Sequence, residues 1–234
     1  MIRVAFLDID NTLLSFSDYV REAMKRGFAK YDLHPKTDDL DELMAIYDEV
    51  NGALWRQLER GEMTFEELID IRWNRVFAAM GIVFDGRAFE RYFRDALQES
   101  AIPEPGAKEL LAYLHSKYTL CAASNGPYEQ QVHRLEVGGM KDVFAHCFIS
   151  EAAGAQKPDP AFFDYCFAKL RASGFPNLRT EETMLIGDSL TSDIAGGKNY
   201  GMKTCWYRKQ AKPVSAGGEP DFIVDHLTQI QEIL

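Results

Sequence analysis

The chain has 234 residues, of which 46% are hydrophobic and 26% are charged, and its formal net charge at pH 7 is −10. These values are typical of a globular protein and exclude an intrinsically disordered chain. The excess of acidic residues, without a basic cluster, argues against a protein that binds nucleic-acid polymers, but it leaves small phosphorylated ligands open.

The N-terminal segment and the cysteines give no sign of secretion or of a zinc site. Charged residues at Arg3, Asp8 and Asp10 are not expected in a signal peptide, and no apolar run is long enough to span a bilayer. The four cysteines include no CxxC pair, so we expect them to be small core residues. The expected location is the cytoplasm, with no membrane contact.

Short apolar runs recur along the chain and are typical of strands buried on both faces of a parallel sheet, because they show little polar alternation. They span residues 3–7, 118–123, 146–150, 183–187, 203–207 and 221–225. Helical patterns lie between and after them, at residues 105–117, 127–137, 159–173, 192–200 and 227–234. This alternation predicts an α/β fold with a doubly wound, Rossmann-like parallel sheet. A polar loop is expected at residues 208–220.

One block of the chain interrupts this alternation directly after the first strand. It contains no convincing strand, and amphipathic helices are expected at residues 17–31, 39–60, 64–80 and 86–99. We therefore predict two domains. The α/β core would comprise residues 1–14 and 102–234, and a helical bundle of residues 15–101 would be inserted into it.

Polar side chains follow four of the predicted strands at or just after the point where each strand ends. Because the carboxyl ends of parallel strands meet at one edge of a sheet, these residues can converge on one ligand site. They are Asp8 and Asp10 after the first strand, Ser124, Asn125 and Gly126 after the second, Lys157 after the third, and Asp188 and Asp193 after the fourth.

The chemistry of these residues favours a metal and a phosphoryl group. Asp8 and Asp10 can share a face of the strand end, and together with Asp188 they would repel one another without a cation. Mg²⁺ prefers such oxygen ligands and commonly binds substrate phosphate as well. Lys157 and the Ser124 hydroxyl supply positive charge and donors for that phosphate. One carboxylate can then attack phosphorus while its neighbour handles a proton.

Each motif taken singly also has an ordinary structural explanation. Asp8 and Asp10 could form a solvated turn after an edge strand. Lys157 before Pro158 could begin a surface helix. Ser124, Asn125 and Gly126 could form an ordinary turn between a strand and a helix. Asp188 and Ser189 could cap the helix that follows them. The presence of all four motifs at four strand ends makes these explanations weaker than a shared site.

The segments DIDNT (8–12), SNG (124–126), KPDP (157–160) and GDSLTSD (187–193) resemble, in order, the four motifs of the haloacid dehalogenase superfamily, in its phosphatase branch. The helical block resembles the cap domain of that family, so the likeness covers the whole chain in layout. The resemblance implies a Mg²⁺-dependent phosphomonoesterase that acts through an aspartyl-phosphate intermediate on a small-molecule phosphate monoester.

The resemblance also implies a role for each motif residue. Asp8 would be the nucleophile, and Asp10 the general acid that later activates water. Mg²⁺ would be bound by Asp8, by the Asp10 backbone carbonyl and by Asp188, with Asp193 as an outer partner. The remaining motif residues would hold the phosphate during catalysis or shape the loops that do so, namely Lys157, Ser124, Asn125, Gly126 and Thr12.

Longer segments narrow the expected substrate. Residues 157–167, 186–206 and 60–73 look like those of the pyrimidine 5′-nucleotidase subgroup, so a nucleoside 5′-monophosphate is the expected substrate. Trp55, Trp73 or Tyr128 could stack on a base, although aromatic residues at helical spacing more often pack in a core.

Other functions stay open at this point. The rival enzymes are a phosphoglycolate or sugar-phosphate phosphatase and a 2-haloacid dehalogenase. Asp10 speaks against the dehalogenase, because that chemistry needs neither an acid for an alkoxide leaving group nor a metal. A protein that only senses phosphate compounds is a further alternative. The sequence implies no particular oligomeric state.

Overall fold

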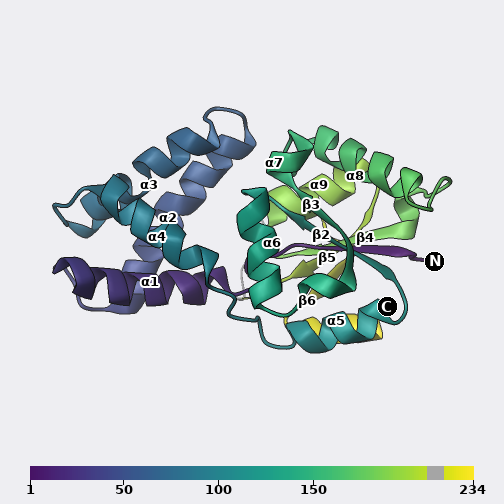
Figure 1. The fold of residues 1–234 in the computed structure, drawn as a ribbon, viewed down its shortest axis with the longest axis horizontal. Coiled ribbons are helices and arrows are strands. Elements are labelled where there is room, and N and C mark those ends of the chain that lie inside the picture. Colours follow the sequence, from purple (N-terminus) through teal and green to yellow (C-terminus); the bar gives the residue numbers. More distant parts are fainter. Residues whose placement is uncertain (210–218) are drawn as a thin grey trace. The chain divides into compact units, whose positions relative to one another are not determined.

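The computed structural model describes residues 1–209 and 219–234 and divides the chain into two compact units. One unit comprises residues 1–15 and 101–234, and the other comprises residues 16–100. Figure 1 shows the first unit as a sheet with helices on both faces and the second as a group of helices. Most of the loop predicted at 208–220 lies outside the described residues.

The first unit contains a six-stranded parallel sheet, which confirms the predicted doubly wound fold. The spatial order of the strands is β3-β2-β1-β4-β5-β6, so the winding reverses between β1 and β4. The strands are β1 (Val4–Leu7), β2 (Thr119–Ser124), β3 (Phe144–Ile149), β4 (Thr183–Gly187), β5 (Lys203–Tyr207) and β6 (Phe222–Val224).

Helices connect these strands as expected, with two differences. The helix predicted at 192–200 is divided into a π-helical turn, η3 (Leu190–Ile194), and a short helix, α9 (Ala195–Tyr200). The helix predicted at 227–234 is a 3₁₀ segment, η4 (Leu227–Glu232), because so short a segment gains little from α-helical hydrogen bonds. The other helices are α5 (Ala107–His115), α6 (Tyr128–Val137), α7 (Ser150–Ala153) and α8 (Pro160–Ala172), with the 3₁₀ turns η1 (Lys141–Val143) and η2 (Thr180–Glu182).

Strand β1 is buried on both faces, which explains its uninterrupted apolar sequence. Ala5 and Leu7 belong to the core beneath α5, whereas Val4 and Phe6 belong to the core beneath α8. The Phe6 ring stacks on Phe148 with centroids 5.8 Å apart. Burial of one such side chain contributes roughly 2 kcal/mol to folding. Packing from both sides therefore holds the end of β1 rigidly.

The second unit consists of α1 (Phe16–Tyr31), α2 (Leu40–Glu59), α3 (Phe65–Met80) and α4 (Gly86–Gln98). Thr64 and Glu67 form a capping box that begins α3. Trp73 is buried and packs on Phe89 with ring centroids 4.4 Å apart, so it serves the core of this unit. Among the helices in the described part of the chain, none combines the length and apolar composition needed to cross a membrane.

Candidate active site

The strand order brings the predicted site residues to the crevice where open parallel sheets bind ligands. Leu7 at the end of β1 lies opposite Ala122 on β2 and Ile186 on β4. The Asp8 backbone N–H extends this pairing by donating to the Ile186 carbonyl at 2.9 Å. The loops after β1, β2 and β4 therefore leave the sheet side by side.

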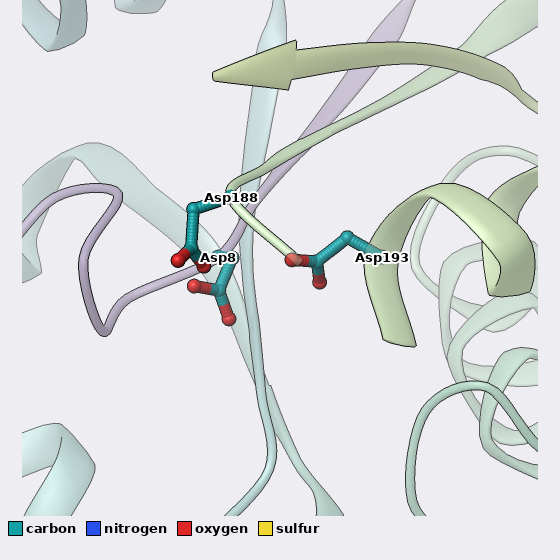
Figure 2. Close-up of side chains that lie close together, drawn as sticks. All are labelled: Asp8, Asp188 and Asp193. Carbon is teal, nitrogen blue, oxygen red and sulfur yellow. The ribbon is translucent and has the colours of Figure 1, made fainter. Parts of the chain in front are cut away.

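Three aspartates form a carboxylate cluster at this edge. One oxygen from each of Asp8, Asp188 and Asp193 lies within 4.8 Å of the others. Figure 2 shows Asp8 and Asp188 on adjacent loops, with the Asp193 side chain reaching toward them from η3. Asp8 and Asp193 are buried, whereas Asp188 is partly exposed. Carboxylates this close repel one another unless positive charge lies nearby.

Lys157 supplies part of that charge. Its Nζ donates to Asp8 Oδ1 at 2.8 Å and to Asp193 Oδ1 at 2.6 Å. The third bond goes to the Ala123 carbonyl at 2.6 Å, which uses all the donors of an ammonium group. The side chain is buried, and α8 begins only at Pro160. A solvated surface helix start, one of the ordinary explanations, is therefore wrong for Lys157.

Burial and mutual attraction shift the pKa values of this pair. Burial raises the pKa of Asp8 from 3.8 to about 7, although the Lys157 ammonium opposes the rise. Burial by itself would lower the pKa of Lys157, but the Asp193 and Asp8 carboxylates raise it above its ordinary value. Lys157 therefore stays charged at neutral pH and favours the ionised form of Asp8.

Two further motif residues orient this pair. Thr12 Oγ1 donates to Asp8 Oδ2 at 3.1 Å, so both carboxylate oxygens of Asp8 accept a hydrogen bond. The Asn125 side chain pairs with the backbone of Lys157. Its Nδ2 donates to the Lys157 carbonyl at 2.8 Å, and its Oδ1 accepts from the Lys157 N–H at 2.9 Å. Asn125 thus joins the loops after β2 and β3.

Asp10 is held by two residues that the sequence analysis did not select, Gln131 and Arg134. The Asp10 carboxylate accepts from Arg134 Nη1 at 2.7 Å and from Gln131 Nε2 at 2.8 Å. Gln131 Nε2 also donates to Ser124 Oγ at 2.7 Å. The available signal was a pair of polar residues three positions apart on the helix that follows the Ser124 loop. Asp10 does not belong to the carboxylate cluster, and its predicted metal contact is its backbone carbonyl.

Hydrogen bonds also fix the other loops of the site. The Gly126 N–H donates to Ser150 Oγ at 2.8 Å. Trp206 Nε1 donates to the Asp188 backbone carbonyl at 2.9 Å. Ser189 Oγ caps η3, so capping is done by Ser189 while the Asp188 carboxylate lies in the cluster. The sheet edge therefore gathers residues from all four motifs.

Gly187, the last residue of β4, leaves space for Asp193. A methyl group at this position would lie 2.2 Å from Asp193 Oδ2, which is held by the Ser189 N–H at 3.1 Å. We expect Gly187→Ala to lower the free energy of unfolding by about 1–3 kcal/mol and to reduce hydrolysis, because Asp193 must move. Urea unfolding and turnover measure both effects.

The matched control is Gly52→Ala. Gly52 lies in α2, and only the flexible end of one side chain comes near its Cβ position. This change should be neutral or should stabilise by up to about 1 kcal/mol, because alanine favours a helix. Similar losses for both variants would contradict the proposed packing of Gly187 against Asp193.

Comparison with known proteins supplies independent evidence on the family. Residues 2–201 match the family model for haloacid dehalogenase-like hydrolases. The HAD-hydrolase YfnB of Bacillus subtilis is 32% identical to this chain and covers 99% of it, over 95% of its own length. The crystal structure of YfnB bound to magnesium matches with a TM-score of 0.87 and covers 100% of this chain and 98% of that chain.

Two pyrimidine 5′-nucleotidases are also similar. PynA of Streptococcus pneumoniae is 34% identical over 86% of this chain and 81% of its own. YjjG of Escherichia coli is 30% identical over 98% of this chain and 96% of its own. The resemblance to this subgroup is therefore confirmed. The family match and the similarity over nearly the full length show that the chain is a hydrolase and belongs to the haloacid dehalogenase-like hydrolase family.

Proposed function

We propose that this hydrolase is a Mg²⁺-dependent phosphomonoesterase that releases phosphate from nucleoside 5′-monophosphates, with a preference for pyrimidines. The observation that carries the chemistry is the carboxylate cluster of Asp8, Asp188 and Asp193 in contact with Lys157. The substrate class is supported by the similarity to PynA and YjjG over most of the chain.

The residues present suit Mg²⁺. The clustered side chains offer only oxygen ligands, which hard divalent cations prefer. When ionised, the three carboxylates carry two more negative charges than Lys157 compensates, and a divalent cation would balance them. Asp8, Asp188 and the Asp10 backbone carbonyl would hold the ion, while Asp193 binds Lys157. When bound, Mg²⁺ would offset negative charge on the substrate phosphate.

Each side chain of the site has a separate role in the proposed reaction. An Asp8 oxygen bonds to phosphorus as the bond from phosphorus to the leaving oxygen breaks, and Asp10 gives a proton to that oxygen. In the second step, Asp10 takes a proton from water as the water oxygen bonds to phosphorus and Asp8 leaves. The Ser124 hydroxyl would orient the phosphoryl group through its O–H donor, and the Lys157 ammonium would attract that group by its positive charge. Thr12 and Lys157 limit the rotation of the Asp8 carboxylate.

A panel of phosphate monoesters tests the proposal. The purified protein should release phosphate from uridine and cytidine 5′-monophosphates faster than from purine nucleotides, phosphoglycolate or sugar phosphates. A chelator should abolish release because the carboxylates, without Mg²⁺, would repel the negatively charged substrate phosphate. Added Mg²⁺ should restore release. Mg²⁺ should also raise the thermal unfolding temperature without substrate, because it would bind only the folded cluster.

Each outcome of the panel has a definite meaning. Preference for phosphoglycolate or a sugar phosphate would contradict the proposed substrate while keeping the chemistry. Release that is unchanged by the chelator would contradict the proposed role of Mg²⁺. The absence of release from every ester in the presence of Mg²⁺ would contradict the proposed function as a whole.

A further inference from the structure

Gln131 and Arg134, both on α6, form a hydrogen-bond network with Asp10 and Ser124. From Gln131 and Arg134, and the groups that they contact, we infer that these two residues position the carboxylate of Asp10 for proton transfer. This inference rests on the proposed function, because it assigns them to the proposed general acid. Both side chains are buried, and each donates to a different oxygen of Asp10.

The orientation of the Gln131 amide follows from the donors around it. Arg134 Nη1 donates to Gln131 Oε1 at 2.8 Å, and a guanidinium group can only donate. Gln131 Nε2 must therefore face the other side of the network. Its two hydrogens match its two acceptors, Asp10 Oδ2 at 2.8 Å and Ser124 Oγ at 2.7 Å. These three contacts define the amide orientation.

One side chain thus sets the separation between two proposed functional groups. Gln131 links Asp10, the proposed proton donor, to Ser124, a proposed phosphate ligand. Arg134 keeps this link in place by binding both Gln131 and Asp10. Movement of either side chain on α6 would change the distance from the proton donor to the phosphate.

The exposure of the pair shows which side is available to a substrate. The Arg134 side chain is 1% exposed, whereas that of Asp10 is 31% exposed. A carboxylate offers about four lone-pair positions, and the two donors described here use two of them. The outer side of Asp10 can therefore meet a leaving-group oxygen while its inner side stays bound. A purely structural ion pair does not require this arrangement.

The consequence can be measured by changing the leaving group. A nucleoside leaves as an alkoxide and needs a proton as the phosphorus–oxygen bond breaks, whereas p-nitrophenolate leaves readily without one. Displacement of Asp10 should therefore slow formation of the aspartyl-phosphate from uridine 5′-monophosphate much more than from p-nitrophenyl phosphate. General damage to the fold would slow both substrates alike.

The test uses Gln131→Met, with Gln130→Met as the matched control on the same helix. Gln131→Met should lower kcat/KM for uridine 5′-monophosphate roughly 100-fold, because kcat/KM reports the step that forms the aspartyl-phosphate. It should lower kcat/KM for p-nitrophenyl phosphate less than about 10-fold, since the second step, in which Asp10 activates water, is common to both esters and does not enter kcat/KM. Gln130 makes none of these contacts, so its variant should stay within about 2-fold of wild type on both esters.

Two further variants distinguish positioning from structural support. Arg134→Lys keeps the charge but lacks the fork that reaches both Asp10 and Gln131, so it should show an intermediate loss with the same dependence on the leaving group. In an Asp10→Asn background, Gln131→Met should cause no further loss with uridine 5′-monophosphate, because the positioned group is already absent. Circular dichroism checks folding, and Arg134→Lys carries the comparison if Gln131→Met unfolds.

Equal losses on the two esters, or a full additional loss in the Asp10→Asn background, would overturn the inference. These results differ from failure of the proposed function. In that case the wild-type protein itself would release no phosphate from either ester, and the inference would fall with the function on which it rests.

Discussion

Replacement of Asp8 by asparagine is expected to reduce phosphate release at least 10⁴-fold, roughly the scale on which loss of a catalytic nucleophile acts. An amide cannot form the aspartyl-phosphate that the proposed reaction requires. The fold should survive, because Lys157 keeps Asp193 and the Ala123 carbonyl as partners. Burial raises the pKa of Asp8 to about 7, so removal of this carboxylate also removes a desolvated charge. Phosphate release from uridine 5′-monophosphate and thermal unfolding measure both parts.

The control for this variant is Asp225→Asn. Asp225 is exposed and pairs with Arg208 at 2.7 Å. Such a surface pair contributes at most about 1 kcal/mol, so turnover and stability should stay close to wild type. A phosphorylated peptide containing Asp8, trapped by rapid acid quench of the wild type, would be direct support. Turnover by Asp8→Asn near that of the wild type would exclude Asp8 as the nucleophile.

Lys157→Met is expected to have the largest effect on stability. It leaves the buried carboxylates of Asp8 and Asp193 without their counter-charge, which typically costs about 3–5 kcal/mol. Turnover should also fall about 10²–10³-fold, because the positive charge beside the phosphoryl group is lost. Urea unfolding in buffer without divalent cations measures the stability, and phosphate release with Mg²⁺ measures the turnover.

The stability deficit of Lys157→Met should depend on pH in a definite direction. Lys157 lowers the pKa of Asp8, so its removal should raise that pKa further above the unfolded value of 3.8. A carboxyl group with a raised folded-state pKa binds more protons in the folded protein than in the unfolded chain, so stability rises as pH falls through that interval. The deficit should therefore be larger at pH 8 than at about pH 5.

A second Lys157 variant separates the effect of charge from that of geometry, and a surface lysine provides the control. Lys157→Arg keeps the charge, so it should recover part of the stability while turnover stays low, because a guanidinium does not reproduce the three bonds of the ammonium. Lys198→Met removes a half-exposed lysine that pairs with Asp221 at 3.3 Å, and it should change stability by less than about 1 kcal/mol. A deficit for Lys157→Met no larger than that of Lys198→Met would contradict the buried charge network.

These variants test different roles within the proposed active site. The Asp8 variant should lose turnover and keep its stability. Lys157→Met should lose both turnover and stability, whereas Lys157→Arg should lose turnover but recover part of the stability. Gln131→Met should lose activity selectively with leaving groups that need a proton. This pattern would distinguish the nucleophile, the charge partner and the positioning residue from one another.

The sequence by itself determined the fold class and the edge of the sheet where the motifs meet. The run VAFL in β1 reads as a buried strand because both of its faces pack against helices, so polar alternation is absent. The start of α3 is readable from Thr64 and Glu67, because a capping box is a local interaction. An apolar run and a capping box each involve residues close together in the sequence, so both can be recognised without knowledge of the tertiary structure.

Only the tertiary structure decided which side chains contact one another across the motifs. Lys157 could have been a solvated helix start, yet its partners come from the loop after β1, from β2 and from η3, which meet only through the strand order. Gln131 and Arg134 lie more than 120 positions after Asp10 and carry no motif of their own. Trp73, which could have stacked on a base, packs inside the helical unit. Contacts of this kind depend on distances in space between segments far apart in the chain, which local periodicity does not encode.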